Sequence, residues 1–291
     1  MHSNFVNQRN LIAGFAAFTV AAGVPAVQAS VITQDSFPQS SGANLNGAGS
    51  GSGWSTNWTK SGSGATVASS GSLGFGSLVT SGNSAEVNVG TRLYRSIDAS
   101  AYPTALIDAN GNIGGDGQSV YVSFTMQTSE VDPDGAGGDD KFYAMRFARD
   151  AVGTRVLGVG DVGVDGSIKA RINNGAGTEQ VLQGTGDTNV HLYVVRFDFD
   201  DAVGDTISVF FDPSLASEPT TPDATYTGGD FAFDILSIEA FGDGSFFNGT
   251  DEIRIGETYA DVTPIPEPGS MALVGLGGLL MLQRRRGSNQ A

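Results

Sequence analysis

The sequence predicts an all-β protein, a two-sheet antiparallel jelly-roll sandwich flanked by an N-terminal signal peptide and a short C-terminal hydrophobic helix. Three observations support this prediction. Apolar and polar residues alternate over short runs, and clusters of Gly, Asp, Asn and Pro separate these runs, while no internal segment shows a sustained helical period. Glycine, at 42 of 291 residues, is about twice as frequent as in an average protein. Such a chain predicts many short strands joined by turns.

The N-terminal segment 1–29 has the features of a secretory signal peptide. Arg9 precedes an uncharged, mostly apolar run at 11–24, and the letters VQA at 27–29 place small residues ahead of Ser30. A positive start, an apolar middle and a small-residue cleavage site define this class of segment. We therefore expect export through the general secretion machinery and a mature chain that starts near Ser30.

The body between the two processing segments is strongly acidic. The chain has 15 Lys and Arg, and without Arg9 and the three at 284–286 the body keeps 11 against 31 Asp and Glu, a net charge of −20. Such a field disfavours nucleic acid as a partner and favours divalent cations. The chain has no cysteine, which excludes disulfides, thiol catalysis and thiolate metal sites. The domain at 30–262 must therefore depend on its own hydrophobic core.

The segment from Gln39 to Gly90 is rich in Gly, Ser, Asn and Thr, a composition typical of linkers. Apolar residues nevertheless recur along it, as Trp54 and Trp58, Leu73 and Phe75, Leu78 and Val79, and Val87 and Val89. Because a linker does not need them, we predict short strands separated by glycine turns. We expect the two tryptophans in the core, with a sugar-stacking platform as the alternative.

Downstream of this segment the period-2 alternation is stronger. In the run from Ser119, the apolar residues Val120, Val122, Phe124 and Met126 share one face. The predicted strands are "SVYVSFTMQ" from Ser119, "KFYAMRFAR" from Lys141, "VHLYVVRFDFD" from Val190, "TISVFFDP" from Thr206, "DFAFDILSIEAFG" from Asp230 and "DEIRIGETYADV" from Asp251.

The order of these features resembles the concanavalin-A-like, laminin-G-like jelly-roll domains of exported bacterial proteins. The resemblance is carried by "GWSTNW", "SVYVSFTM", "HLYVVRFDF" followed by "DTISVFFDP", and the closing "DEIRIGETYADV". It implies one domain that covers most of the body, from about Asp35 to Val262.

The stretch "SEVDPDG" from Ser129 is the strongest candidate for an enzyme site. Laminarinase-like glycosidases of this fold carry Glu, Asp and Glu alternating on one strand, which sets two carboxyl groups about 5–5.5 Å apart. Glu130 and Asp132 match the start of that pattern, but the second Glu is missing and Pro133 interrupts the strand. We therefore expect a non-enzymatic protein, with a divergent glycoside hydrolase or lyase on the same fold as the alternative.

The same stretch opens a glycine-rich loop with four aspartates. Calcium takes six to eight oxygen ligands, which a flexible acidic loop can supply. The candidate calcium ligands are Asp132, Asp134, Asp139 and Asp140. The alternative is a solvated acidic hairpin loop. His191 lies in a strand without any motif around it, so we expect a structural histidine.

The segment 263–291 reads "TPIPEPGSMALVGLGGLLMLQRRRGSNQA". Its uncharged run at 269–282 has 14 residues and would span about 21 Å as a helix, less than the ~30 Å hydrocarbon core of a bilayer. A helix this short makes a marginal permanent anchor, and it suits a segment that only pauses in the membrane.

The order of Pro266-Glu267-Pro268, an apolar run and then Arg284, Arg285 and Arg286 resembles the PEP-CTERM sorting signal. The resemblance implies an exosortase as partner, a membrane protease that cleaves near the Pro-Glu-Pro. It also implies a protein that is transiently anchored in the inner membrane, with its arginines on the cytoplasmic side, before it reaches the cell surface or extracellular matrix. There we expect a structural or glycan-binding role, with exopolysaccharide as the candidate ligand.

Overall fold

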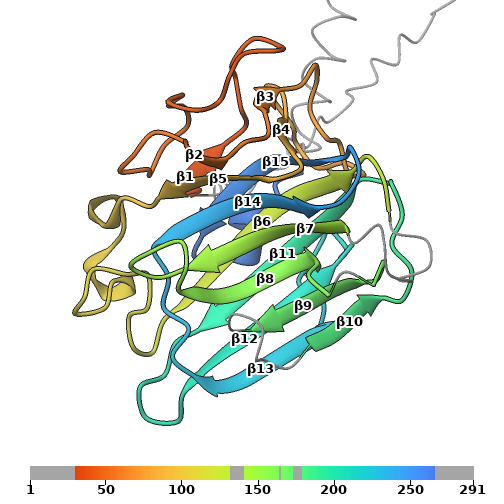
Figure 1. Ribbon diagram of the computed structural model, residues 1–291. Helices are drawn as coiled ribbons and strands as arrows, with labels where there is room; N and C mark the ends of the chain where they lie inside the picture. The colour runs from red at the N-terminus through yellow and green to blue at the C-terminus, as the bar shows by residue number, and fades with distance from the viewer. Residues whose placement is uncertain (1–29, 132–140, 164, 173–178, 266–291) are drawn as a thin grey trace, which may run out of the picture.

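The computed structural model describes residues 30–131, 141–163, 165–172 and 179–265, which form a sandwich of two antiparallel sheets (Figure 1). This arrangement confirms the predicted all-β fold class. Strands that are distant in sequence pair at the centre of both sheets: β6 lies between β11 and β15, and β14 lies between β5 and β7. Because such contacts close long loops, we expect slow folding for a domain of this size.

The eight-stranded sheet has the order β13-β12-β11-β6-β15-β4-β3, and β1 pairs with β15 beside this path. Its strands are β1 (Thr33–Asp35), β3 (Thr66–Ala68), β4 (Ala85–Asn88), β6 (Ser119–Thr128), β11 (His191–Asp198), β12 (Asp205–Phe211), β13 (Ala224–Gly229) and β15 (Phe247–Gly256).

The seven-stranded sheet has the order β10-β9-β8-β7-β14-β5-β2 and lies toward the viewer in Figure 1. Its strands are β2 (Thr59–Gly62), β5 (Thr91–Ser96), β7 (Lys141–Ala148), β8 (Arg155–Asp161), β9 (Ile168–Ile172), β10 (Glu179–Gln183) and β14 (Ile235–Gly242). Two short 3-10 turns, η1 (Ala99–Ala101) and η2 (Thr104–Leu106), and one helical turn, α1 (Tyr259–Val262), complete the described elements.

The main core lies between the two sheets and follows the predicted alternation. Phe124 on β6 stacks on Tyr193 of β11, with ring centroids 5.1 Å apart. Phe197 of β11 meets Phe147 of β7 at 5.2 Å and Phe233 at 4.7 Å, which joins the two layers. All five rings are buried, and burying one such side chain contributes about 1.5–3 kcal/mol. The period-2 pattern therefore places aromatic rings where the sheets interlock.

The Gly-rich N-terminal segment is built around a buried ion pair. Asp35 on β1 accepts hydrogen bonds from Arg95 Nη1 at 2.7 Å, Trp58 Nε1 at 2.8 Å and Ser50 Oγ at 2.7 Å. Because β1 belongs to one sheet and Arg95 lies on β5 of the other, this pair bridges the layers. Trp58 is fully buried and Trp54 partly so, which confirms the expectation that the tryptophans serve the core.

Tight glycine turns let this segment lie against β1. Gly51 has a φ of +70°, and a Cβ there would stand 1.8 Å from the Gln34 carbonyl oxygen. Gly53 has a φ of +75°, and a Cβ there would stand 2.0 Å from Thr33 Oγ1. A residue with a side chain fits neither the backbone conformation nor the space at these positions. The high glycine content is thus partly a packing requirement.

Two local predictions differ from the structure. The pairs Leu73/Phe75 and Leu78/Val79 form no strand; they lie in a loop that packs Leu78 on the outer face of the eight-stranded sheet. The last predicted strand also ends early, because Tyr259–Val262 forms α1 with a capping box between Thr258 and Asp261. In both places tertiary contacts to the sheet outweigh the local strand preference.

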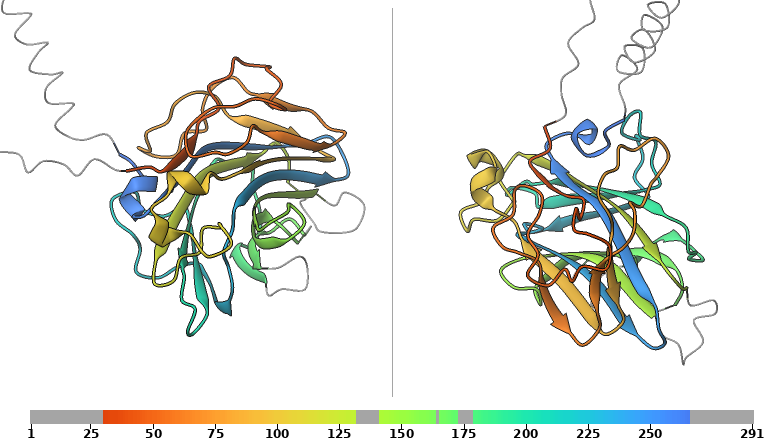
Figure 2. Two further views of the ribbon diagram at one scale, coloured as in Figure 1. Left: turned by 90° about the vertical axis from the view of Figure 1, so that its left-hand side faces the viewer. Right: turned by 90° about the horizontal axis from the view of Figure 1, so that it is seen from above.

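The two ends of the described chain meet at α1 (Figure 2). Asp261 Oδ1 accepts a hydrogen bond from the backbone nitrogen of Ser30 at 2.7 Å, while its other oxygen accepts from the Thr258 nitrogen at 2.8 Å. One carboxylate therefore holds both the start of the sandwich and its last turn.

We expect Asp35→Asn to lower the free energy of unfolding by about 3–5 kcal/mol, because Arg95 would stay buried without its counter-charge. Urea unfolding of the full chain measures this loss. Asp243→Asn, at an exposed position in the β14–β15 turn, is the matched control and should change stability by about 0.5 kcal/mol or less. Equal effects of the two substitutions would contradict the role given to the pair.

Candidate functional site

The described chain leads directly into the predicted sorting segment. Thr263 Oγ1 donates to the Tyr259 carbonyl at 2.8 Å, and Val79 N donates to the Pro264 carbonyl at 2.9 Å. The predicted sorting residues Pro266, Glu267, Pro268, Arg284, Arg285 and Arg286 lie outside the described residues. Among the residues that are described, no helix has the length and apolar character needed to cross a membrane.

The candidate calcium ligands Asp132, Asp134, Asp139 and Asp140 also lie outside the described residues. Across the described ranges, no group of three or more His, Cys, Asp or Glu side chains is placed to hold a metal ion. Glu130, the first residue of the candidate glycosidase pattern, is half exposed and stands 3.7 Å from Lys141 Nζ. The structure thus places Glu130 in a surface ion pair.

An acidic pocket of about 350 Å³ opens between loops at one end of the sandwich. Its carboxylates serve as acceptors for nearby backbone nitrogens. Asp205 accepts from Asp200 N at 3.0 Å and from Phe231 N at 2.6 Å, and Asp108 accepts from Asn110 N and Asn112 N, both at 2.8 Å. These bonds order the loops, as Asx turns do.

The closing phrase of the sequence places two acidic residues in a bulge of β15. Asp251 and Glu252 interrupt the register between β15 and β6, and Glu252 has a φ of +52°. Ser72 Oγ and Leu73 N donate to Asp251, while Ser81 N and Arg254 donate to Glu252. Burial raises the pKa of Asp251 to about 8. Both carboxylates are buried beneath the loop that carries Leu73 and Ser81, so they fix this loop on the sheet.

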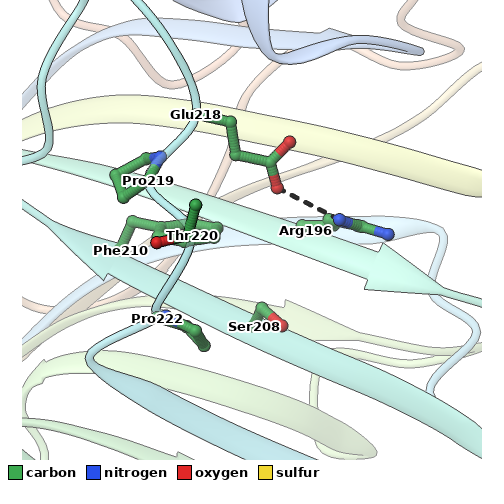
Figure 3. A pocket seen from close by; sticks show the side chains of 7 residues that line it. All are labelled: Arg196, Ser208, Phe210, Glu218, Pro219, Thr220 and Pro222. Atoms are coloured by element: carbon green, nitrogen blue, oxygen red, sulfur yellow. Dashed lines mark hydrogen bonds and ion pairs between the residues drawn. The ribbon is translucent and has the colours of Figure 1, made fainter.

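A polar pocket of about 400 Å³ lies on the outer face of the eight-stranded sheet (Figure 3). Arg196 of β11 reaches across it to Glu218 at 3.1 Å and also contacts Asp198 at 2.8 Å. Phe210 and Pro219 give it apolar walls. Glu218 accepts a further bond from Tyr121 Oη at 2.8 Å. The one cation of this pocket, Arg196, therefore has two carboxylate partners within the protein.

The outer surface of the seven-stranded sheet carries a different arrangement, which we call the arginine face. At its centre the fully buried carboxylate of Glu239 on β14 contacts Arg92 of β5 at 2.6 Å, Arg146 of β7 at 3.1 Å and Arg155 of β8 at 3.3 Å. The Ser237 hydroxyl donates to the same carboxylate at 3.1 Å. One negative group is thus shared by three guanidinium groups.

The rim of the arginine face lies on β9 and β10. Glu179 contacts Lys169 at 3.0 Å and Arg171 at 3.1 Å, and Asp165 holds Lys169 at 2.6 Å. Aromatic rings lie at the other side: Phe142 is 4.7 Å beneath the Arg146 guanidinium, and Phe241 is 5.7 Å from that of Arg92. The face therefore combines cations with partly exposed rings, and the rings interact with the guanidinium groups of the protein itself.

Burial lowers the pKa of Arg146 to about 10. Glu239 opposes this effect, and the neighbouring cations Arg155, Arg171 and Arg92 add to it. The pKa of Arg155 is lowered by burial as well, with the same opposition from Glu239. Burial is thus the main cause of both lowered pKa values, and repulsion among neighbouring arginines adds to it.

His191 is buried between two carboxylates. Its Nδ1 lies 2.7 Å from Asp212 and its Nε2 lies 2.9 Å from Asp187, and its ring packs at a tilt against Phe211, with the centroids 4.7 Å apart. Burial disfavours the charged ring, but the bonds to Asp212 and Asp187 outweigh it and raise the pKa of His191. With both nitrogens engaged, His191 is the structural residue that the sequence predicts.

The arginine face was not predicted from the sequence. Its side chains come from strands far apart along the chain, and only the register between β5, β14, β7, β8 and β9 brings them together. A weak signal was present, because Phe142 and Arg146 occupy outward positions of one strand, as Lys169 and Arg171 do of another.

We expect His191→Gln to lower stability at pH 5.5 by about 1–2 kcal/mol and by much less at pH 9. Because the pKa of His191 is raised in the folded protein, protonation of this residue stabilises the fold. The stabilisation is complete below the ordinary histidine pKa near 6.5 and is lost as the pH rises through the pKa of His191 in the folded protein. Thermal unfolding of the wild type and the variant between pH 5.5 and pH 9 measures the difference in their stability.

The difference in stability between the wild type and His191→Gln isolates the contribution of His191. The raised pKa of Asp251 lowers the stability of both proteins equally as the pH rises toward 8, so it cancels from this difference. A gap that stays constant from pH 5.5 to pH 9 would contradict the charged state assigned to His191.

No curated protein matches the sequence of this chain. Among solved structures, the chain is similar to an endo-β-1,4-glucuronan lyase from the fungus Trichoderma reesei, with 10% identity, a TM-score of 0.46, and 81% of this chain and 99% of that one covered. An endo-1,3-β-glucanase from Streptomyces sioyaensis gives 12% identity, a TM-score of 0.48, and coverage of 81% and 98%. The globular domain of T. cruzi calreticulin gives 14%, 0.47, and coverage of 79% and 89%. Likenesses this weak inform neither the chemistry nor the ligand of this chain.

The C-terminal segment gives a specific match. Residues 264–286 match the family model of the PEP-CTERM protein-sorting motif. The matched range contains the Pro-Glu-Pro at 266–268, the apolar run and the arginines at 284–286, in the predicted order. The chain therefore carries a PEP-CTERM sorting motif behind an antiparallel β-sandwich, which indicates an exported protein that an exosortase processes.

Proposed function

We propose that this protein is a non-enzymatic component of the cell surface or extracellular matrix, delivered by exosortase processing, whose β-sandwich serves as a structural or glycan-binding domain. The observation that carries the proposal is the PEP-CTERM motif at 264–286, which follows the sandwich without a spacer. Before processing, the apolar run holds the chain transiently in the inner membrane.

The junction between the sandwich and the motif supports this order of events. Ser123 Oγ of β6 donates to the Val262 carbonyl at 2.6 Å, and the Pro264 carbonyl is bonded to Val79. Ile265, with 43% of its surface exposed, is the first exposed residue after these contacts. Cleavage near the Pro-Glu-Pro would therefore leave every described contact of the sandwich intact.

Three buried carboxylates on the two sheets support a role without catalysis. Glycoside cleavage needs one carboxyl group as acid and a second as base or nucleophile, both facing the sugar. Glu239 is bound by three guanidinium groups, and Asp251 and Glu252 are buried beneath a loop. Each of them already has its partners within the protein.

We expect replacement of Pro266-Glu267-Pro268 by three alanines to leave the full-length protein in the membrane fraction of the host. The apolar run would remain attached because the exosortase recognises the Pro-Glu-Pro. Cell fractionation followed by immunoblotting measures this. Glu257→Ala, an exposed position just upstream of the motif, is the control and should be processed as the wild type is. Normal release of the triple variant would contradict the sorting role.

We also expect the purified protein to release no new reducing ends from the host's exopolysaccharide during prolonged incubation. The physical reason is that Glu239, Asp251 and Glu252 are buried and already bound by partners within the protein. A reducing-sugar assay measures this. Release that disappears in Glu130→Gln would contradict the proposal and favour a divergent hydrolase or lyase.

A further inference from the structure

The buried carboxylate of Asp261 joins the two ends of the described chain but has no cationic side chain beside it. Its Oδ1 accepts the backbone N–H of Ser30 at 2.7 Å, and its Oδ2 accepts that of Thr258 at 2.8 Å. Only 7% of Asp261 is exposed. Among the residues that the structure describes, no Lys, Arg or His side chain forms an ion pair with it. Asp35, which is also buried, has Arg95 as such a partner. Asp261 thus lacks the counter-charge that a buried carboxylate commonly has.

Strand pairing fixes the Ser30 nitrogen beside Asp261. β1 pairs with β15 in antiparallel register, and just before β1 the Ile32 nitrogen donates to the Ile255 carbonyl at 2.9 Å. β15 ends at Gly256, where a Cβ would stand 2.5 Å from the Asp261 Cβ. Glycine at this position therefore lets α1 fold back against the start of the sandwich.

The predicted signal-peptide cleavage changes the chemistry of this contact. In the precursor the Ser30 nitrogen is an amide, because it follows Ala29 in the chain. When a signal peptidase hydrolyses this bond, the C–N bond breaks and the water oxygen bonds to the Ala29 carbonyl carbon. Both water protons end on the Ser30 nitrogen, which leaves a carboxylate and an ammonium. The ordinary pKa of an α-amine is about 8, so this nitrogen is mostly charged at pH 7.

We propose that removal of the signal peptide between Ala29 and Ser30 creates an ion pair between the Ser30 ammonium and Asp261, which locks the start of the mature chain onto α1. This inference rests on the proposed function, because only an exported chain loses its signal peptide. The same carboxylate caps α1 together with Thr258, and α1 leads to Pro264, where the sorting motif begins. Cleavage at one end of the chain therefore strengthens the turn from which the signal at the other end continues.

The other titratable groups around Asp261 do not take this place. Those on the elements packed about it are Asp35 of β1, Tyr102 after η1, Tyr121 of β6, Asp251, Glu252 and Arg254 of β15, Glu257 after β15, Tyr259 of α1, and Glu218 near Tyr259. Within the described ranges, none of their side chains bonds to Asp261. Arg254 is paired with Glu252, and Glu257 is exposed. The charge on the Ser30 nitrogen therefore acts on Asp261 without a competing side chain.

The first residue of the mature protein, read by mass spectrometry of its N-terminal peptide after isolation from the host, is the first test. We expect Ser30. A chain that begins at any other residue would overturn the inference, because each residue of extended chain moves the amine by about 3.3 Å and out of bonding distance of Asp261.

The charge itself is tested on the full mature chain, residues 30–291 in neutral detergent, with an amine-acylating reagent between pH 6 and pH 10. Only the unprotonated amine reacts, and a neighbouring carboxylate favours the protonated form. We expect the Ser30 amine to react about three- to tenfold more slowly at pH 7.5 than the same amine in a free peptide of residues 30–35. The rate should also reach half its maximum at a higher pH, which steric shielding alone would not cause.

Asp261→Asn should return this half-maximum to the pH of the free peptide, because the amide keeps an acceptor oxygen but carries no charge. Glu257→Gln is the matched control: it removes an exposed carboxylate from the same segment and should leave the profile as in the wild type. An unshifted profile in the wild type, or equal effects of the two substitutions, would overturn the inference.

A third measurement leaves Asp261 in place, so it does not depend on the folding of Asp261→Asn. Two chains, beginning at Ala29 and at Ser30, are released from a cleavable tag that leaves no extra residue. The longer chain keeps the amide contact with Asp261 and lacks the charge on that nitrogen. At pH 6 the Ser30 chain should unfold at a temperature about 1–3 °C higher.

This difference should vanish by pH 10, because the stabilisation is lost as the pH rises through the pKa of the amine in the folded protein. Equal unfolding temperatures at pH 6 would contradict the ion pair. The sorting reaction is tested separately by the Pro-Glu-Pro variant. Normal release of that variant would contradict the proposed function and leave the results on the mature N-terminus in place.

Discussion

The buried ion pair between Asp35 and Arg95 is the interaction on which the N-terminal part of the sandwich depends. Asp35 accepts hydrogen bonds from Phe37 N and Ser50 Oγ on one oxygen and from Trp58 Nε1 and Arg95 Nη1 on the other. A carboxylate with four donors is close to saturated, which is the condition under which a buried charge is tolerated. Burial lowers the pKa of Arg95, and Asp35 opposes that effect.

The same pair explains how a linker-like composition becomes an ordered layer. Arg95 also donates to the carbonyls of Thr56 and Ser50, and it lies over the Trp54 ring at 4.9 Å. These contacts hold a Gly- and Ser-rich segment that buries few apolar residues of its own. Because the pair joins a strand of each sheet, it couples the segment to both layers at once.

The two sheets differ in what their outer faces do. Loops, α1 and a second small core that includes Tyr121, Leu192 and Tyr259 cover the eight-stranded sheet, so its central strands are apolar on both faces. The seven-stranded sheet instead presents Glu239 and its arginines. Ser30 and Pro264, from which the chain continues at either end, are attached on the side of the eight-stranded sheet. The attachment to the membrane and the arginine face are thus separated by the thickness of the sandwich.

The sequence by itself determined the fold class and the PEP-CTERM motif, because both are recorded in local order: alternation every second residue, and a short linear pattern of proline, apolar and arginine residues. It also identified His191 and the tryptophans as structural. It could not show that Leu73–Val79 is a covering loop, since its apolar residues serve a surface that strands elsewhere create. Only the tertiary structure decided the arginine face, because its members occupy separate strands and meet through strand register and the buried charge of Glu239.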